Sequence, residues 1–384
     1  MSAGALATVA GIAPPQPDRV FKFGLACGGT GGHIFPGLAT AEVLRHQGHQ
    51  VTLWLAGKDI ESSAVQRWPG PKHTIQAQGF QGGVSLKAVG TASRLFSACR
   101  ETIRLMALDR PDALLAMGSY ASVGPVIAAL RFRVPVVLHE SNVIPGRAIG
   151  LLAPVATEVD ACFEESRHYL RGARVKITGF PLRSELVAAA RATPYAPRRS
   201  GRFQILVMGG SRGAVPLNEK VIQAAIHLRR VESNFHIIHL AGPQDAKRVR
   251  EHYEKHRIPA TVHEFVQNMA EIYSITDIAI CRAGAATCAE LSCFGIPSLL
   301  VPYPYAARDH QTANAKAMER VGAADQVREE DLEPGWLAEY LEGSMNTPAR
   351  LLRISRAARQ RSHLRAAEEV AERLITAAAA RARR

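Results

Sequence analysis

The strongest constraint on the fold is an alternation of short β-rich runs with amphipathic stretches, which occurs twice along the 384 residues. The first series runs from Val20–Ala26 to Val134–His139, and the second from Phe203–Met208 to Ser298–Val301. This rhythm is typical of β-α-β units, which build mostly parallel sheets. Between the two series, residues 171–201 are rich in turn-forming and basic residues, so we place a hinge there. The sequence therefore predicts an α/β protein with two similar domains.

Composition narrows the class of protein. Hydrophobic residues make up 47% and charged residues 21%, as in ordinary globular proteins. The sequence contains no uninterrupted run of eighteen apolar residues, which a membrane-spanning helix would need. The six cysteines are scattered without a C-x-x-C pair, which indicates a reducing compartment and no zinc site. Met1–Asp18 lacks the charged and apolar regions of a secretory signal and resembles a loose arm. We therefore expect a cytosolic globular protein.

The charge of the chain points to acidic partners. Lys and Arg number 47 against 34 Asp and Glu, a formal net charge of +13, which favours nucleic acid, phosphorylated substrates or an anionic membrane face. Residues 349–384 carry ten Arg and three Glu and are expected to form a basic helix. That helix either packs on the body through Leu351, Leu352 and Ile354, with its arginines solvated, or contacts anionic lipid.

A glycine-rich turn follows the first predicted strand, at Cys27–Gly37, and opens a helix beginning near Pro36. Its glycines and the helix amino terminus suit a diphosphate. The spacing does not fit G-x-G-x-x-G, and the next strand offers no acid for a ribose, so NAD is not expected. The only Gly-Lys pair, Gly57-Lys58, lacks the other residues of a P-loop, which argues against ATP hydrolysis.

His33 lies within this turn, where a near-neutral imidazole could take a proton from a substrate hydroxyl. A loop histidine taken alone is more often structural, since it can cap a helix or hold a turn. The glycine-rich setting favours the catalytic interpretation.

The second series contains glycine-rich turns of the same kind. Gly209–Ala214 follows a strand and implies a second phosphate cradle, and Arg282–Leu291 forms another glycine turn and helix. Glu290 on that helix could bind a ribose diol, or it could be an ordinary solvated helix residue. Farther along, Pro302–Ala315 presents amide and hydroxyl side chains of the kind that suit a sugar.

The ordered set of motifs resembles the MurG family, bacterial transferases that add N-acetylglucosamine to undecaprenyl-pyrophosphoryl-N-acetylmuramyl-pentapeptide. The resemblance extends from about Val20 to the C-terminus. It is carried by Gly28–His33, His139–Asn142, Gly179–Arg183, Gly209–Ala214, Arg282–Glu290 and Asp309–Asn314.

The resemblance implies a GT-B fold, with two Rossmann-like domains facing across a cleft. It divides the chain into a flexible arm (1–19), an acceptor- and membrane-facing domain (20–183), a UDP-sugar domain (184–362) and a basic C-terminal helix (363–384) that packs back on the N-terminal domain. The donor-binding residues that it implies are Thr30, Gly31, Gly32, Asn142, Arg183, Ser211, Val266, Ala285, Ala286, Thr287, Glu290 and Gln311.

The implied reaction is an inverting transfer from UDP-N-acetylglucosamine to the 4-hydroxyl of the muramyl sugar, in peptidoglycan synthesis. His33 is our candidate base, although it could instead bind a substrate phosphate. Two departures from the family pattern, Arg212 and Ala286, affect possible contacts with the donor. We expect no cofactor and no protein-held metal, because no Asp-x-Asp pair or His/Cys cluster is present.

A lipid-linked acceptor would place the enzyme peripherally on the cytoplasmic face of the bacterial inner membrane. Gly79–Leu105 interleaves apolar and basic residues, with Arg131–Arg133 as an extension, and is the expected contact surface unless its apolar residues are core.

Other functions stay open from the sequence. Within the enzymes, a UDP-N-acetylglucosamine 2-epimerase or a transferase with another lipid acceptor could share the fold. A nucleic-acid-binding protein would explain the charge, but aromatic residues are only 6% and no RRM, KH or zinc-finger motif is recognised, so no nucleic-acid partner is expected.

Overall fold

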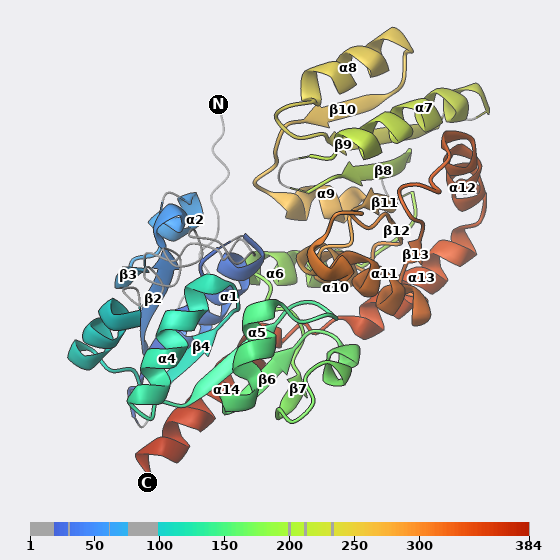
Figure 1. The fold of residues 1–384 in the computed structure, drawn as a ribbon. Coiled ribbons are helices and arrows are strands. Elements are labelled where there is room, and N and C mark those ends of the chain that lie inside the picture. Colours follow the sequence, from blue (N-terminus) through green and yellow to red (C-terminus); the bar gives the residue numbers. More distant parts are fainter. Residues whose placement is uncertain are drawn as a thin grey trace, which may run out of the picture.

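The computed structural model describes residues 19–29, 31–60, 62–75, 99–198, 201–210, 213–231 and 234–383. They form two lobes, each with one sheet covered by helices (Figure 1). The N-terminal lobe holds β1–β7 and the C-terminal lobe holds β8–β13. The prediction of an α/β protein with two Rossmann-like domains is confirmed.

The N-terminal sheet has seven strands in the order β3-β2-β1-β4-β5-β6-β7, and neighbouring strands pair in parallel. Every residue of the central strands β4 and β5 is buried, because helices cover both faces of the sheet. The strands are β1 (Lys22–Ala26), β2 (Gln50–Ala56), β3 (Lys72–Ile75), β4 (Ala113–Ala116), β5 (Val136–Glu140), β6 (Glu158–Ala161) and β7 (Val175–Ile177).

The C-terminal sheet has six parallel strands in the order β10-β9-β8-β11-β12-β13. In both sheets the first strand of the lobe lies between the second and a later one, which makes a topological switch point where open α/β sheets bind ligands. The strands are β8 (Phe203–Met208), β9 (Phe235–Leu240), β10 (Ala260–His263), β11 (Ile278–Cys281), β12 (Ser298–Leu300) and β13 (Asp325–Gln326).

Helices cover both sheets. Those that follow the N-terminal strands are α1 (Gly31–His46), α2 (Ser63–Gln66), a helix at 99–108, α4 (Val123–Arg131), α5 (Arg147–Leu152) and α6 (Ser184–Ala192). The later ones are α7 (Val215–Val231), α8 (Ala246–Lys255), α9 (Met269–Ile275), α10 (Ala285–Phe294), α11 (His310–Arg320), α12 (Pro334–Asn346), α13 (Pro348–Arg361) and α14 (Ala366–Ala382). Short 3-10 helices are η1 (Gly57–Asp59), η2 (Tyr120–Ser122), η3 (Ala153–Val155), η4 (Glu164–His168) and η5 (Ala307–Asp309).

The first helix begins earlier than the sequence predicts. We expected it to start near Pro36, but α1 starts at Gly31 and holds Pro36 inside. A proline lacks an amide hydrogen, so Pro36 removes only the bond to the carbonyl four residues earlier. The preceding turn is helical because its own amides need no partner within the helix.

The basic C-terminal region is two helices rather than one. Helix α13 packs on the C-terminal lobe, where Leu351 and Ile354 are buried. After a break at residues 362–365, α14 returns to the N-terminal lobe and packs on α1 and β4 (Figure 1). Leu374 is fully buried there, which contributes about 2 kcal/mol to the packing. The C-terminal helix thus completes the core of the N-terminal lobe.

Candidate functional site

The turn after β1 is built for close approach. Gly29 has a φ of +121°, a backbone angle that residues with a side chain rarely adopt. A Cβ on Gly28 would lie 2.5 Å from the Ala56 nitrogen and 2.6 Å from the Asp59 carboxylate. Only glycine fits both positions, and α1 begins two residues later, where the first amides of a helix have no partner within the helix.

His33, in the first turn of α1, lies in the cleft between the lobes. Burial lowers its pKa, while the negative charge of Asp59 acts in the opposite direction. The imidazole is therefore neutral at pH 7 and can accept a proton.

The last residues of β5 brace the loop that enters the cleft. The two carboxylate oxygens of Glu140 accept hydrogen bonds from the amides of Asn142 and Gly146, each at 2.8 Å. Burial raises the pKa of Glu140 to about 7, although those bonds oppose the shift. His139 lies 3.0 Å through Nε2 from the Gly179 carbonyl, and burial lowers its pKa to about 4. A neutral His139 therefore donates to the segment that connects the lobes.

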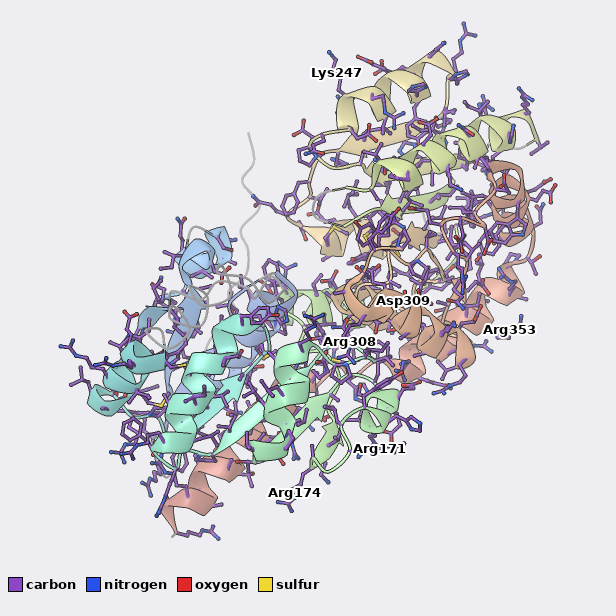
Figure 2. All side chains as sticks on the ribbon, viewed as in Figure 1. Arg171, Arg174, Lys247, Arg308, Asp309 and Arg353 are labelled. Atoms are coloured by element: carbon purple, nitrogen blue, oxygen red, sulfur yellow. The ribbon has the colours of Figure 1, made fainter. Side chains whose placement is uncertain are left out.

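Asn314 on α11 joins the lobes at the base of the cleft. Its Oδ1 accepts from the Val143 amide at 3.0 Å, and its Nδ2 donates to Asn142 Oδ1 and to the Ala283 carbonyl, both at 3.0 Å. Arg308, which Figure 2 shows between the lobes, donates to the Pro145 carbonyl at 3.0 Å. Asn314 closes the family motif, but no sequence pattern predicts its contacts with the N-terminal lobe, because Val143 and Asn142 lie 171 and 172 residues away.

The amino end of α10 supplies the wall of the cleft in the C-terminal lobe. Gly284 is the N-cap residue, and Ala285 and Ala286 follow it into the cleft. One turn later, Glu290 accepts a hydrogen bond from the Tyr273 hydroxyl at 2.6 Å. Burial raises the pKa of Glu290, whereas Tyr273 and the charge of Arg183 lower it. Glu290 is therefore not the ordinary solvated helix residue that one interpretation proposed.

These elements enclose a cleft of about 740 Å³. Of the predicted site residues, it brings together Gly32, His33, Asn142, Ala285 and Ala286. The other lining residues are Ser119, Tyr120, Ser141, Ile144, Pro145, Gly146, Arg147, Ala148, Phe180, Gly284, Ala307, Arg308 and His310. The cleft joins the β1 turn of one lobe to the α10 turn of the other.

The other predicted residues that the structure describes do not line this cleft. Arg183 lies with its guanidinium 5.5 Å from the centre of the Phe35 ring. Val266 packs against the core of the C-terminal lobe, and Gln311 accepts from the Tyr303 amide at 2.9 Å. Gly31 and Thr287 lie next to lining residues in the sequence. Thr30, Ser211 and Arg212 lie outside the described residues, as do residues 1–18 and 76–98.

The described part of the chain holds no cluster of three or more His, Cys, Asp or Glu that could bind a metal ion. Across the same residues, no helix has the length and apolar content needed to cross a bilayer.

The chain matches the models of the glycosyltransferase family 28 N-terminal domain over residues 23–160 and C-terminal domain over residues 204–373. It is 35% identical over 355 residues to a UDP-N-acetylglucosamine--N-acetylmuramyl-(pentapeptide) pyrophosphoryl-undecaprenol N-acetylglucosamine transferase of Geobacter metallireducens, covering 92% of this chain and 97% of that protein. The crystal structure of Acinetobacter baumannii MurG superposes with a TM-score of 0.76 at 27% identity, covering 93% of this chain and 99% of that one. The chain belongs to the MurG family. It is therefore a glycosyltransferase, as the resemblance implied.

The same fold occurs outside the MurG family. A putative UDP-N-acetylglucosamine 2-epimerase from Listeria monocytogenes superposes with a TM-score of 0.63 at 12% identity, covering 92% of this chain and 95% of that one. At that identity the likeness concerns the fold alone. The 35% identity to the Geobacter transferase, over nearly the whole length of both chains, supports membership in the MurG family instead.

Proposed function

We propose that the protein transfers N-acetylglucosamine from UDP-N-acetylglucosamine to the 4-hydroxyl of undecaprenyl-pyrophosphoryl-N-acetylmuramyl-pentapeptide in peptidoglycan synthesis. One observation carries the proposal for this member of the MurG family. The cleft places a neutral histidine from the N-terminal lobe opposite the amino end of α10 in the C-terminal lobe. A base and an anion-binding helix end are the two groups that displacement of a diphosphate needs.

The donor is assigned mainly to the C-terminal lobe. The amides at Ala285–Thr287 support the diphosphate, and Glu290 receives the ribose hydroxyls by exchanging its bond to Tyr273. Arg183, Ser211, Val266 and Gln311 complete the nucleotide and sugar contacts, and Thr30, Gly31, Gly32 and Asn142 close the pocket from the N-terminal lobe.

The chemistry is a single displacement. His33 takes the proton of the acceptor 4-hydroxyl as its oxygen bonds to the anomeric carbon, and the bond from that carbon to the UDP oxygen breaks on the opposite face. Attack opposite the leaving group inverts the anomeric centre. Arg183 and the α10 amides stabilise the charge that grows on the departing diphosphate.

We assign the membrane contact to the N-terminal lobe, so that the enzyme binds peripherally to the cytoplasmic face. Ile127 and Leu130 on α4 and Leu151 on α5 are exposed apolar residues, and the exposed Arg131 and Arg147 lie on the same two helices. Helices α4 and α5 pack together, so these residues belong to adjoining elements. Apolar residues with basic neighbours suit an anionic interface. The expected segment Gly79–Leu105 lies largely outside the described residues.

Vesicle sedimentation tests this surface. Replacing Leu151 by Glu should weaken binding to vesicles that contain anionic lipid at least about threefold, because an exposed apolar side chain is replaced by a charge that anionic lipid repels. Val231→Glu, on α7 of the C-terminal lobe, is the matched control, since Val231 is also exposed. Equal binding of both variants would remove α5 from the contact.

Release of UDP from UDP-N-acetylglucosamine tests the reaction itself. The proposal expects UDP only when a polyprenyl-pyrophosphoryl-muramyl-pentapeptide acceptor is present, with one disaccharide formed for each UDP. Turnover of the donor without acceptor would indicate an epimerase. Transfer to a different lipid-linked sugar, with none to the muramyl acceptor, would refute the proposed substrate.

A further inference from the structure

The glycine turn after β1 is held from both sides by residues of the neighbouring strands. In the sheet, β1 lies between β2 and β4, and Ala26 is in register with both Trp54 and Ala116. The segments that follow β2 and β4 therefore emerge on either side of the Gly28–Gly29 turn. Each contributes one polar side chain to it.

Asp59 holds the amide side of the turn. It ends η1, the short helix after β2, and is only 5% exposed. One carboxylate oxygen, Oδ2, accepts from the Gly29 amide at 2.7 Å and from the Ala56 amide at 3.1 Å. A buried carboxylate with two amide donors fixes the distance between the β1 turn and the end of β2.

Ser119 holds the carbonyl side. Its hydroxyl donates to the Gly28 carbonyl at 2.5 Å and accepts from the Ala121 amide at 3.2 Å. The backbone of Ser119 has φ 64° and ψ 171°, a conformation that costs a residue with a side chain about 1–3 kcal/mol. The hydroxyl bonds hold Ser119 in a conformation that glycine would adopt with less strain.

The clamped turn borders the imidazole of His33. A Cβ on Gly29 would lie 3.9 Å from His33 Nδ1, and a Cβ on Gly118 would lie 3.5 Å from Nε2. The ring therefore sits between the β1 turn and the β4 turn, and Ser119 connects those two turns. Any shift of the Gly28–Gly29 turn or of Ser119 would move the walls on both sides of the ring.

We propose that Asp59 and Ser119 are positioning residues of the transfer reaction, which clamp the Gly28–Gly29 turn and so fix His33 at the cleft. The inference rests on the proposed function, because it assigns His33 the role of base. Neither residue acts on the substrate; each acts through the geometry of His33.

The charge of Asp59 gives the clamp a second, separable effect. It opposes the fall in the pKa of His33 that burial causes. Among the described residues, the other titratable and charged groups near the ring are His139 at the end of β5 and the cleft residues Tyr120, Arg147, Arg308 and His310. All of them are neutral or basic, so Asp59 is the acid among these groups. Removing its charge should lower the pKa of His33 and move the acidic limb of the rate profile to lower pH.

Kinetics of full-length variants test the clamp. Asp59→Ala and Ser119→Ala should each lower kcat at least about fivefold while the donor KM stays within about twofold, because a misplaced base affects the chemical step. Asp59→Asn keeps an acceptor oxygen, so it should retain more of kcat than Asp59→Ala while showing the shifted acidic limb. Asp109→Asn is the matched control, since Asp109 is a half-exposed partner of Lys22 at the other end of β1.

Two results would overturn the clamp. One is that the Ala variants keep more than half of the wild-type kcat with an unshifted pH profile, and the other is a loss confined to the donor KM. If Asp59→Ala fails to fold, as judged by thermal unfolding and UDP binding, Asp59→Asn and Ser119→Ala decide the question by the same criteria. A wild-type enzyme that transfers no sugar refutes the proposed function instead, whereas an active wild type with unaffected variants refutes only the clamp.

Discussion

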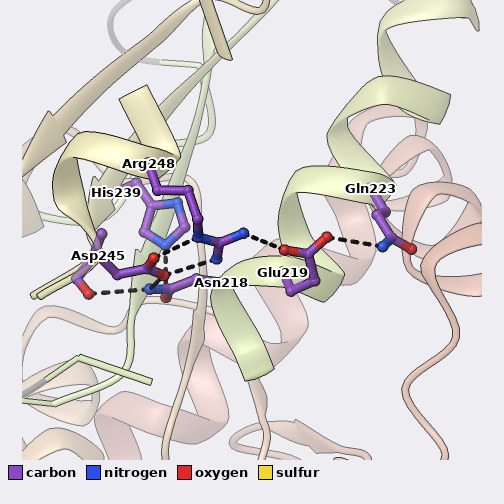
Figure 3. Close-up of polar contacts among 7 residues, drawn as sticks. Asn218, Glu219, Gln223, His239, Asp245 and Arg248 are labelled. Carbon is purple, nitrogen blue, oxygen red and sulfur yellow. Dashed lines mark hydrogen bonds and ion pairs between the residues drawn. The ribbon is translucent and has the colours of Figure 1, made fainter. Parts of the chain in front are cut away.

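The two lobes anchor equivalent glycine turns in different ways. The turn after β1 is held by two single side chains, Asp59 and Ser119, which bond directly to its backbone. The turn after β8 leads into α7, which is tied to the end of β9 by a buried network of side chains (Figure 3). One topology thus permits a local clamp in the lobe that carries His33 and a distributed network in the lobe assigned to the nucleotide.

Asn218 is the centre of the network. Its Nδ2 donates to the Ala241 carbonyl at 3.0 Å and to Asp245 Oδ2 at 2.8 Å, and its Oδ1 lies 3.0 Å from His239 Nε2. His239 Nδ1 lies 2.8 Å from the Tyr253 hydroxyl. Since the Asn218 oxygen can only accept, Nε2 carries the proton and Nδ1 accepts from Tyr253.

Arg248 extends the network to the surface. It pairs with Asp245 at 2.6 Å and also with Glu219, which accepts from Gln223 (Figure 3). These hydrogen bonds lower the pKa values of Asp245 and Glu219. A distributed network should therefore lose more stability from one deletion than a local clamp does.

The largest effect should come from the centre of the network. Asn218→Ala leaves His239 Nε2 and the Ala241 carbonyl without their buried Asn218 partner and removes one bond to Asp245, so it should lower the free energy of unfolding by about 3 kcal/mol. Urea unfolding measures the loss. Gln223→Ala, on the exposed face of α7, is the control and should cost less than about 0.5 kcal/mol. Equal losses would show that the network does not act as a unit.

The next effect is the pH dependence of the same network. Burial lowers the pKa of His239 to about 3, so the unfolded chain binds more protons and His239 disfavours folding as the pH falls below 6.5. His239→Gln removes this titration. Its stability deficit relative to wild type should therefore shrink by about 2.5 kcal/mol between pH 7 and pH 4.5.

The comparison with wild type is essential to that measurement. Burial raises the pKa values of Glu140 and Asp160 to about 7, and protonating these carboxyls favours the folded state as the pH falls. Their contribution is common to both proteins and cancels in the difference. His227→Gln, at an exposed position on α7, is the matched control. A constant deficit for His239→Gln would contradict burial of a neutral His239.

A smaller effect is expected at the clamped turn. His33→Ala should reduce turnover at least about tenfold, or about 1.4 kcal/mol in the activation barrier, with UDP affinity nearly unchanged. Its free energy of unfolding should change less than that of Asn218→Ala. Unchanged turnover would remove His33 from the mechanism and, with it, the functional contrast between the lobes.

The smallest effect concerns the donor pocket. Glu290→Ala should raise the KM for UDP-N-acetylglucosamine about fivefold, or about 1 kcal/mol, because one carboxylate contact to the ribose is lost. Glu319→Ala on α11 is the control, since the exposed Glu319 carboxylate accepts from the side-chain amide of Gln326. An unaltered KM for Glu290→Ala would refute the ribose role and leave Glu290 as the structural partner of Tyr273.

Local pattern predicted the turns but not what holds them. Gly28, His33 and Ala285 belong to strand-turn-helix segments that are visible in consecutive residues, and the structure places them in or beside one cleft. Asp59 follows the Gly57-Lys58 pair, which lacks the other residues of a P-loop, and no motif in the sequence includes Ser119. A usable signal existed, since polar residues just after the strands next to a glycine turn are candidates to hold it.

Periodicity and motif order are properties of neighbouring residues, so the two α/β lobes, their glycine turns and the family could all be predicted from the sequence. Three contacts could be found only in the folded structure: those of Asp59 and Ser119 with one turn, those of Asn314 between the lobes, and those of α14 with the N-terminal core. The bond between Gly29 and Asp59 joins residues 30 positions apart, and the bond between Asn142 and Asn314 joins residues 172 positions apart. Such separations depend on strand order and chain crossover, which hydrophobic pattern alone does not encode.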